Sequence, residues 1–219
     1  MAPDALFAKS VFLSRLLQKE EVQENYITST NKAFFNHLLE LMISRRIVVT
    51  LPAGTIALRT GAETFVLFAS SLIWPMIDSY YSTLLYTVSM AIDRNSTGAS
   101  TSVEATQIIK RVQWLSESLY DEKVIKYYEA CNIESIKNAI ATFKELGVLV
   151  QKSVFIMLSD SYRSDETLLT GLLEQINDYR CSTNVEEALS SILQADGKVK
   201  NSQSLRRSLM IEFPFMAKL

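Results

Sequence analysis

The chain has 219 residues, enough for one medium-sized domain or two small ones, and its 48% hydrophobic and 21% charged residues are typical of a globular protein. Its formal net charge of −2 gives no electrostatic basis for binding nucleic acid. The two cysteines, Cys131 and Cys181, and the lack of a secretory leader predict free thiols in a reducing compartment and a protein that is not secreted.

The first third of the chain predicts two helices followed by a β-hairpin. Residues 4–17 have apolar side chains at helical spacing, and Pro3 suits a first turn. Asn31 is a suitable cap for the next helix. Residues 47–49 then change to the period of a strand, the letters LPAG predict a turn, and residues 55–58 predict the returning strand.

The most distinctive segment is residues 65–90, which are almost wholly apolar or aromatic but are interrupted by Pro75 and Asp78. Three interpretations are open: a buried core helix broken near Pro75, a hairpin at a membrane surface, or a membrane span. A span needs about 20 mostly apolar residues, and an aspartate near its middle is costly. The core helix is therefore favoured, because proline disrupts a helix interior.

Beyond this segment the pattern of the first third recurs. An amphipathic helix is predicted over residues 105–119. Asn132 can cap a further helix, which Gly147 ends, and residues 148–150 and 154–158 predict two strands. The two helix–strand–turn–strand segments, near 31–60 and 132–158, are typical of winged-helix-like units. We therefore predict a mainly α fold, a helical domain with two small β-hairpins.

The remainder of the chain predicts two shorter helices, over residues 168–176 and 185–193. Carboxylates in the first turn of each favour the helix dipole. Residues 196–219 are polar and basic and are expected to form a flexible tail. The predicted single helical domain therefore covers residues 1–195.

No catalytic constellation is found among the candidate groups. His37 is the only histidine and lies among apolar neighbours, so it is interpreted as a residue that flanks the core. No second histidine or paired cysteines stand at ligand spacing, so we predict no metal site and no cofactor. The glycine turn at residues 51–55 lacks the context of a phosphate loop, and Ser159 has no suitable partner histidine.

The string FASSLIWPMIDSYYSTLLYTVSM resembles the C-terminal region of the glycerol-3-phosphate acyltransferases, in the branch that also holds the dihydroxyacetone-phosphate acyltransferases. That family has a similar Pro-hydrophobic-hydrophobic-acidic-x-Tyr segment, here Pro75 to Tyr80. A helix like VQWLSESLYDEKVIKYYEACNIESIKNAIATFKELGVLV follows at similar spacing, and the opening DALFAKSVFLSRLLQKEEV is similar too. The resemblance covers about residues 4–158.

The resemblance implies a piece of an enzyme of phospholipid biosynthesis rather than its reacting part. The family transfers an acyl group from a thioester to glycerol 3-phosphate with a His-x4-Asp pair. Neither that pair nor the family's Pro-Glu-Gly-Thr motif is matched here: Met42 stands where the aspartate would follow His37, and Ala53 replaces the glutamate. The chain alone is therefore predicted to be inactive, as a truncated product, a partial gene model or one part of a split enzyme.

The predicted role is to pack against an acyltransferase catalytic domain, in cis or in trans, with possible peripheral contact to an intracellular membrane. That membrane would be the mitochondrial outer membrane, the endoplasmic reticulum or the peroxisome. No nucleic-acid partner is expected. The alternative is a non-catalytic winged-helix-like scaffold or regulatory module. The candidate packing and interface residues are Trp74, Pro75, Asp78, Tyr80, Tyr81 and Trp114.

Overall fold

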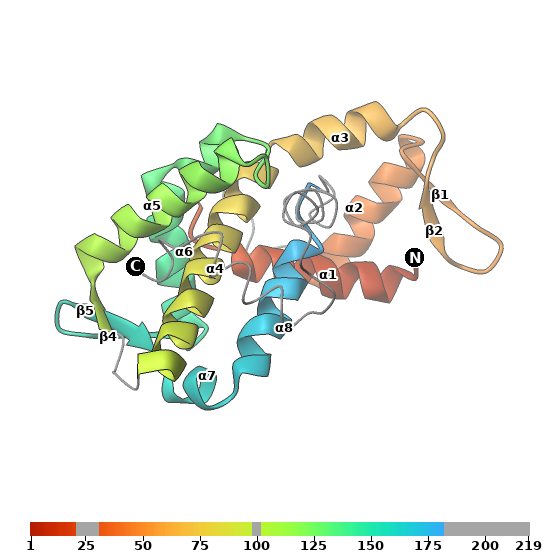
Figure 1. The fold of residues 1–219 in the computed structure, drawn as a ribbon. Helices are drawn as coiled ribbons and strands as arrows, with labels where there is room; N and C mark the ends of the chain where they lie inside the picture. The colour runs from red at the N-terminus through yellow and green to blue at the C-terminus, as the bar shows by residue number, and fades with distance from the viewer. Residues whose placement is uncertain (21–30, 98–101, 182–219) are drawn as a thin grey trace, which may run out of the picture. The chain divides into compact units, whose positions relative to one another are not determined.

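The computed structural model describes residues 1–20, 31–97 and 102–181 (Figure 1). These residues form two compact units, Met1–Ile73 and a second unit that starts at Trp74. Within the described ranges the protein is mainly helical and contains both predicted hairpins, one as a sheet of two strands and the other within a sheet of three. The predicted helix over 185–193 and the tail over 196–219 lie outside these ranges. The single domain of residues 1–195 stays a prediction, because two compact units can still fold together.

The described residues of unit 1 form three helices and one hairpin. Its elements are α1 (Pro3–Leu16), α2 (Lys32–Ser44), β1 (Val48–Thr50), β2 (Ile56–Leu58) and α3 (Glu63–Ser71). The predicted cap of α2 is confirmed, because the Asn31 side chain accepts a hydrogen bond from the N–H of Ala33. The α1 and α2 helices meet through the rings of Phe7 and Phe35, whose centroids are 5.2 Å apart.

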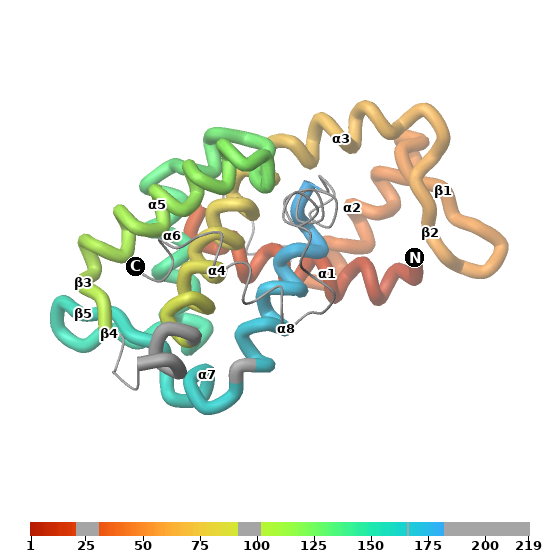
Figure 2. Tube along the Cα trace, in the orientation of Figure 1, coloured from red at the N-terminus to blue at the C-terminus, as the bar shows by residue number. Residues whose placement is uncertain are grey.

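Unit 2 is arranged around one central helix (Figures 1 and 2). Its elements are α4 (Trp74–Thr97), β3 (Ser102–Glu104), α5 (Ala105–Asp121), the short 3₁₀ helix η2 (Tyr128–Cys131), α6 (Ile133–Glu145), β4 (Leu149–Lys152), β5 (Phe155–Leu158), α7 (Asp160–Ser164) and α8 (Glu166–Asn177). Helices α5, α6 and α8 and the η2 turn all pack against α4. The strands form an antiparallel sheet in the order β3-β5-β4.

The apolar segment 65–90 is a helix broken two residues before Pro75, followed by a buried helix. Every residue from 77 to 90 is buried, so α4 is covered on all sides for almost four turns. Its hydroxyl side chains are satisfied locally: Ser82, Thr83 and Thr87 each donate to the carbonyl four residues earlier. The core-helix interpretation is therefore confirmed. In the part of the chain that is described, no helix is long and apolar enough to span a bilayer.

The two predicted helix–hairpin units are equivalent in their backbone hydrogen bonds. In unit 1 the N–H of Ile47 donates to Met42 at 2.9 Å, and in unit 2 the N–H of Val148 donates to Phe143 at 2.9 Å. Both hairpins close in the same way, with Arg59 donating to Ile47 and Ser159 to Val148, each at 2.9 Å. The sequence did not reveal β3, which adds a third strand to the hairpin of unit 2.

Candidate functional site

The six candidate residues occupy different environments within unit 2. Tyr80 is fully buried, and its ring lies edge-on to that of Phe143 at 6.1 Å. Trp74, the first residue of α4, stacks on Tyr127 with centroids 6.3 Å apart. Trp114 is 39% exposed on α5. The residues therefore divide into buried packing groups and groups at the surface, rather than forming one site.

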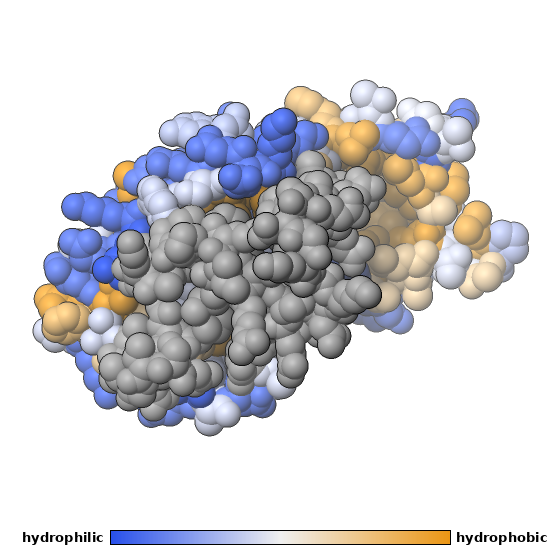
Figure 3. Space-filling model, viewed as in Figure 1, coloured by the Kyte–Doolittle hydropathy of each residue, from blue (hydrophilic) through white to orange (hydrophobic). Residues whose placement is uncertain are grey.

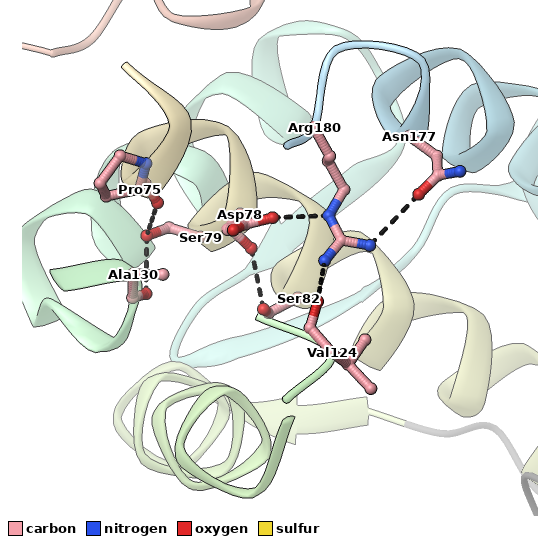
Figure 4. A network of polar contacts seen from close by, with 8 residues as sticks. All are labelled: Pro75, Asp78, Ser79, Ser82, Val124, Ala130, Asn177 and Arg180. Atoms are coloured by element: carbon pink, nitrogen blue, oxygen red, sulfur yellow. Dashed lines mark hydrogen bonds and ion pairs between the residues drawn. The ribbon is translucent and has the colours of Figure 1, made fainter. Parts of the chain in front are cut away.

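Pro75 and Ser79 connect the start of α4 to η2. The Ser79 hydroxyl lies 3.1 Å from the Pro75 carbonyl and 2.7 Å from the Ala130 carbonyl, and both oxygens can accept its proton (Figure 4). The second of these contacts is buried and joins segments 51 residues apart. Pro75 itself occupies the second position of α4, where its missing N–H costs the helix nothing.

Asp78 forms a buried ion pair with Arg180, just beyond α8 (Figure 4). The Nε of Arg180 donates to Asp78 Oδ1 at 2.5 Å, and both side chains are only 2% exposed. The other guanidinium nitrogens donate to the Val124 carbonyl at 2.7 Å and to Asn177 Oδ1 at 3.2 Å. The guanidinium also lies over the Tyr81 ring, 3.8 Å from its centroid. One side chain therefore connects α4, α8 and the turn after α5.

The electrostatics of this cluster follow from its burial. Burial raises the pKa of Asp78 above its ordinary value, and the charge and hydrogen bond of Arg180 lower it part of the way back. Burial likewise raises the pKa of Tyr81, with Arg180 acting against the rise and Asp78 adding to it. A buried carboxylate that lost this guanidinium would favour its neutral form. Arg180 therefore lets a charged Asp78 stay in the core.

Trp74 belongs to a second, more exposed cluster. The Lys126 ammonium lies over the Tyr127 ring at 5.3 Å and over the Trp74 ring at 6.0 Å. It also lies 3.9 Å from the sulfur of Cys181. The hydrogen bond with Tyr127, followed by the charge of Cys181, raises the pKa of Lys126. The cluster is an aromatic surface patch with a fixed positive charge.

The residue types that carry catalysis do not converge among the described residues. His37 is exposed on α2, in unit 1, and the glycine turn at 51–55 connects β1 to β2. Cys131 is buried, and burial together with the charges of Glu117 and Asp121 raises the pKa of its thiol to about 11, so it stays protonated at neutral pH. No group of three histidine, cysteine or acidic side chains able to hold a metal occurs in the described ranges.

Sequence reasoning missed Arg180, although Asp78 gave a signal for it. A carboxylate inside an apolar helix is seldom buried without a partner, so its presence predicts a cation from elsewhere in the chain. Spacing cannot identify that cation, because Arg180 is 102 residues away. It stands three residues after the end of α8, at a position that has no periodic relation to the rest of that helix.

These features define a class: a helical, winged-helix-like region whose most buried polar groups serve packing. A family model for the glycerol-3-phosphate acyltransferase C-terminal region matches residues 1–152 of the chain. The chain therefore belongs to that family, and the resemblance seen in the sequence is confirmed. The comparison with curated proteins found no match.

Proposed function

We propose that this chain is a non-catalytic supporting region that packs against the catalytic domain of a glycerol-3-phosphate or dihydroxyacetone-phosphate acyltransferase in phospholipid biosynthesis, at the surface of an intracellular membrane. The observation that carries the proposal is the match to the C-terminal region of that family over residues 1–152. The same stretch contains the buried α4, whose polar side chains are engaged in structural contacts. A region of this kind stabilises a neighbour rather than reacting itself.

The outer face of the three-stranded sheet is the surface that we assign to the catalytic domain. Leu149, Ile156 and Leu158 point into unit 2 and are buried. Val150 and Phe155, on the opposite face by strand alternation, are 37% and 46% exposed. Val154, in the turn between the two strands, is 55% exposed, and Leu146 beside the hairpin is 41% exposed. On the outer face the exposed charged residues Glu104 and Lys152 lie opposite Phe155 in the register. Apolar groups with charged groups beside them are the composition that we expect of a protein–protein contact.

Reconstitution tests this proposal directly. The partner is an acyltransferase catalytic domain expressed without its own C-terminal region, and the reaction is acyl-CoA turnover with glycerol 3-phosphate. We expect no turnover from the present chain alone, co-elution of the two proteins in size-exclusion chromatography, and longer-lived activity of the catalytic domain in the complex. Turnover by the purified chain alone would refute the non-catalytic role.

A matched pair of variants tests the assigned surface. Phe155→Ser removes a side chain that is 46% exposed on the sheet face, and Leu168→Ser removes one that is 45% exposed on α8. We expect only the first to weaken co-elution. If neither variant matters and the wild-type chain never binds the catalytic domain, the alternative of an independent scaffold or regulatory module is favoured.

A further inference from the structure

Three arginines gather at the base of the β1–β2 hairpin of unit 1. Arg45 caps the end of α2, Arg46 follows it, and Arg59 comes directly after β2. The N–H of Arg59 donates to the Ile47 carbonyl at 2.9 Å, which places the two ends of the hairpin side by side. All three arginines are exposed, and residues 41–62 contain no aspartate or glutamate. Residues 45–59 therefore carry three positive charges, and the nearest carboxylates along the chain are those of Glu40 and Glu63.

The backbone of Arg46 is strained for the residue it carries. Its φ is 58°, in the left-handed region, whereas the equivalent position of unit 2 is Gly147 with φ 72°. The two positions are equivalent because each follows the cap of its helix and donates its N–H three residues back, to Ile43 at 2.9 Å and to Lys144 at 3.1 Å. Glycine adopts this conformation without the steric cost that a β-carbon brings. Arginine therefore stands here at a steric cost, as Lys123 does after the cap of α5.

The helix that follows these arginines has an exposed apolar face. Phe65, Phe68 and Leu72 share one side of α3 and its cap, at the spacing i, i+3 and i+7, and are 57%, 64% and 60% exposed. Residues 64–77 contain no charged side chain. In Figure 3 hydrophobic residues colour the part of the surface where Figure 1 places α2 and α3. The N–H of Ala62 donates to the Arg59 carbonyl at 3.0 Å, so α3 begins directly beside the hairpin base.

We infer that the hairpin-base arginines and the apolar face of α3 form a docking surface for an anionic membrane. Phe65, Phe68 and Leu72 insert at the boundary between headgroups and acyl chains, and the arginine guanidinium groups bind lipid phosphates. With nine residues, α3 is about 13.5 Å long, under half the thickness of the hydrocarbon core, so it lies along the surface. The inference deepens the proposed function and rests on its membrane role, for which it names the surface and the lipid class.

The chemistry of the surface favours lipid over protein as the occupant. A protein partner for an exposed helix is normally fixed by charged or polar groups around an apolar centre. The α3 helix offers only Glu63 as a charged group, at its first residue, and that side chain accepts a hydrogen bond from the N–H of Gly61 at 2.6 Å. A bilayer surface offers anionic headgroups above an apolar layer of acyl chains. The arginines match the headgroups, and the large apolar side chains of α3 match the acyl chains.

Vesicle sedimentation tests the inference with the full chain. The vesicles contain phosphatidylcholine alone, or phosphatidylcholine with about one-third phosphatidylserine. We expect binding to the anionic vesicles that weakens as salt is raised. Each arginine near the surface contributes about fivefold to affinity, so Arg45→Gln, Arg46→Gly and Arg59→Gln together should weaken binding about a hundredfold. Phe65→Ser with Phe68→Ser should weaken binding to both kinds of vesicle.

The matched control removes the same charge from unit 2, by Lys110→Gln, Lys137→Gln and Lys152→Gln, all at exposed positions. Circular dichroism checks that every variant is folded. The inference is overturned if the wild-type chain fails to sediment with anionic vesicles, or if the control loses as much affinity as the arginine variant. It is also overturned if the arginine variant binds anionic vesicles as tightly as the wild type does. The assay contains no catalytic domain, so its failure is separate from a failure of the reconstitution.

Discussion

Replacing Arg180 with methionine is expected to destabilise unit 2 more than any surface substitution. Methionine keeps much of the side-chain length but has no donor, so the contacts with Asp78, Val124 and Asn177 are lost together. The Asp78 carboxylate is then left buried without its cation, and the Val124 carbonyl loses a donor. Breaking a buried ion pair in this way costs about 3–5 kcal/mol. We therefore expect a loss of this size in the free energy of unfolding.

Urea unfolding followed by tryptophan fluorescence measures this loss with probes in unit 2, because both tryptophans of the chain, Trp74 and Trp114, lie there. With a slope of about 2 kcal/mol per molar, the midpoint should fall by about 2 M. Lys137→Met is the control. It breaks an ion pair with Glu134 whose side chains are 48% and 72% exposed, and such a pair contributes at most about 1 kcal/mol.

The reasoning is refuted if Arg180→Met unfolds within about 1 kcal/mol of the wild type, as the control is expected to do. A double variant, Arg180→Met with Asp78→Asn, provides a second check. It removes both charges, so it should recover part of the loss even though it restores no ion pair. No recovery would show that packing of the arginine stem, rather than its charge, stabilises the contact between α4 and α8.

The Asp78–Arg180 pair also predicts a pH dependence of stability. The pKa of Asp78 is higher in the folded protein than in the unfolded chain, so the folded state holds this proton more tightly. Protonation of Asp78 therefore stabilises the fold at low pH, and this stabilisation is lost as the pH rises through the folded pKa. Without Arg180 that pKa rises further, so the variant should be closer to the wild type at about pH 5 than at about pH 8, by urea midpoint. At the hairpin bases, both Arg46 and Gly147 have positive φ, which glycine adopts at the least cost. Gly147→Ala should therefore lower the free energy of unfolding by about 1 kcal/mol, and Arg46→Gly should raise it by about the same amount. Melting temperatures that shift in the same direction in both variants would contradict this. Iodoacetamide at neutral pH should modify Cys181 before Cys131, because Cys131 is buried and its pKa is raised to about 11. Mass spectrometry of samples taken over time measures the order, and earlier modification of Cys131 would contradict the expectation.

The secondary structure was predictable because it is encoded locally. Asn31 and Asn132 both cap the helices that they were predicted to cap, and Gly147 has the positive φ expected of a residue that ends a helix. The β3 strand was not predictable, because three residues that pair only with a strand more than fifty residues later have no periodic pattern of their own. Arg180 was missed for the same reason: its partner is determined by the packing of α8 on α4.

Arg46 illustrates a different limit. The hydrophobic pattern correctly predicted a helix followed by a strand, but it could not show that the residue between them has a left-handed backbone. Only the comparison with Gly147 in unit 2 reveals that arginine occupies the position where glycine costs least. The second helix–hairpin unit therefore shows which residue type suits this position of the first.

The fold extends past the segment that identifies the family. The match ends at residue 152, which is also the last residue of β4, whereas β4 pairs only with β5 among the described strands. Ending the chain there would remove the central strand of the sheet, α8 and the only guanidinium described beside Asp78. We expect a chain of residues 1–152 to lack cooperative unfolding by tryptophan fluorescence and a chain of residues 1–181 to retain it. Cooperative unfolding of the shorter chain with an unchanged midpoint would show that α4 and its aspartate are stable without the segment that covers them.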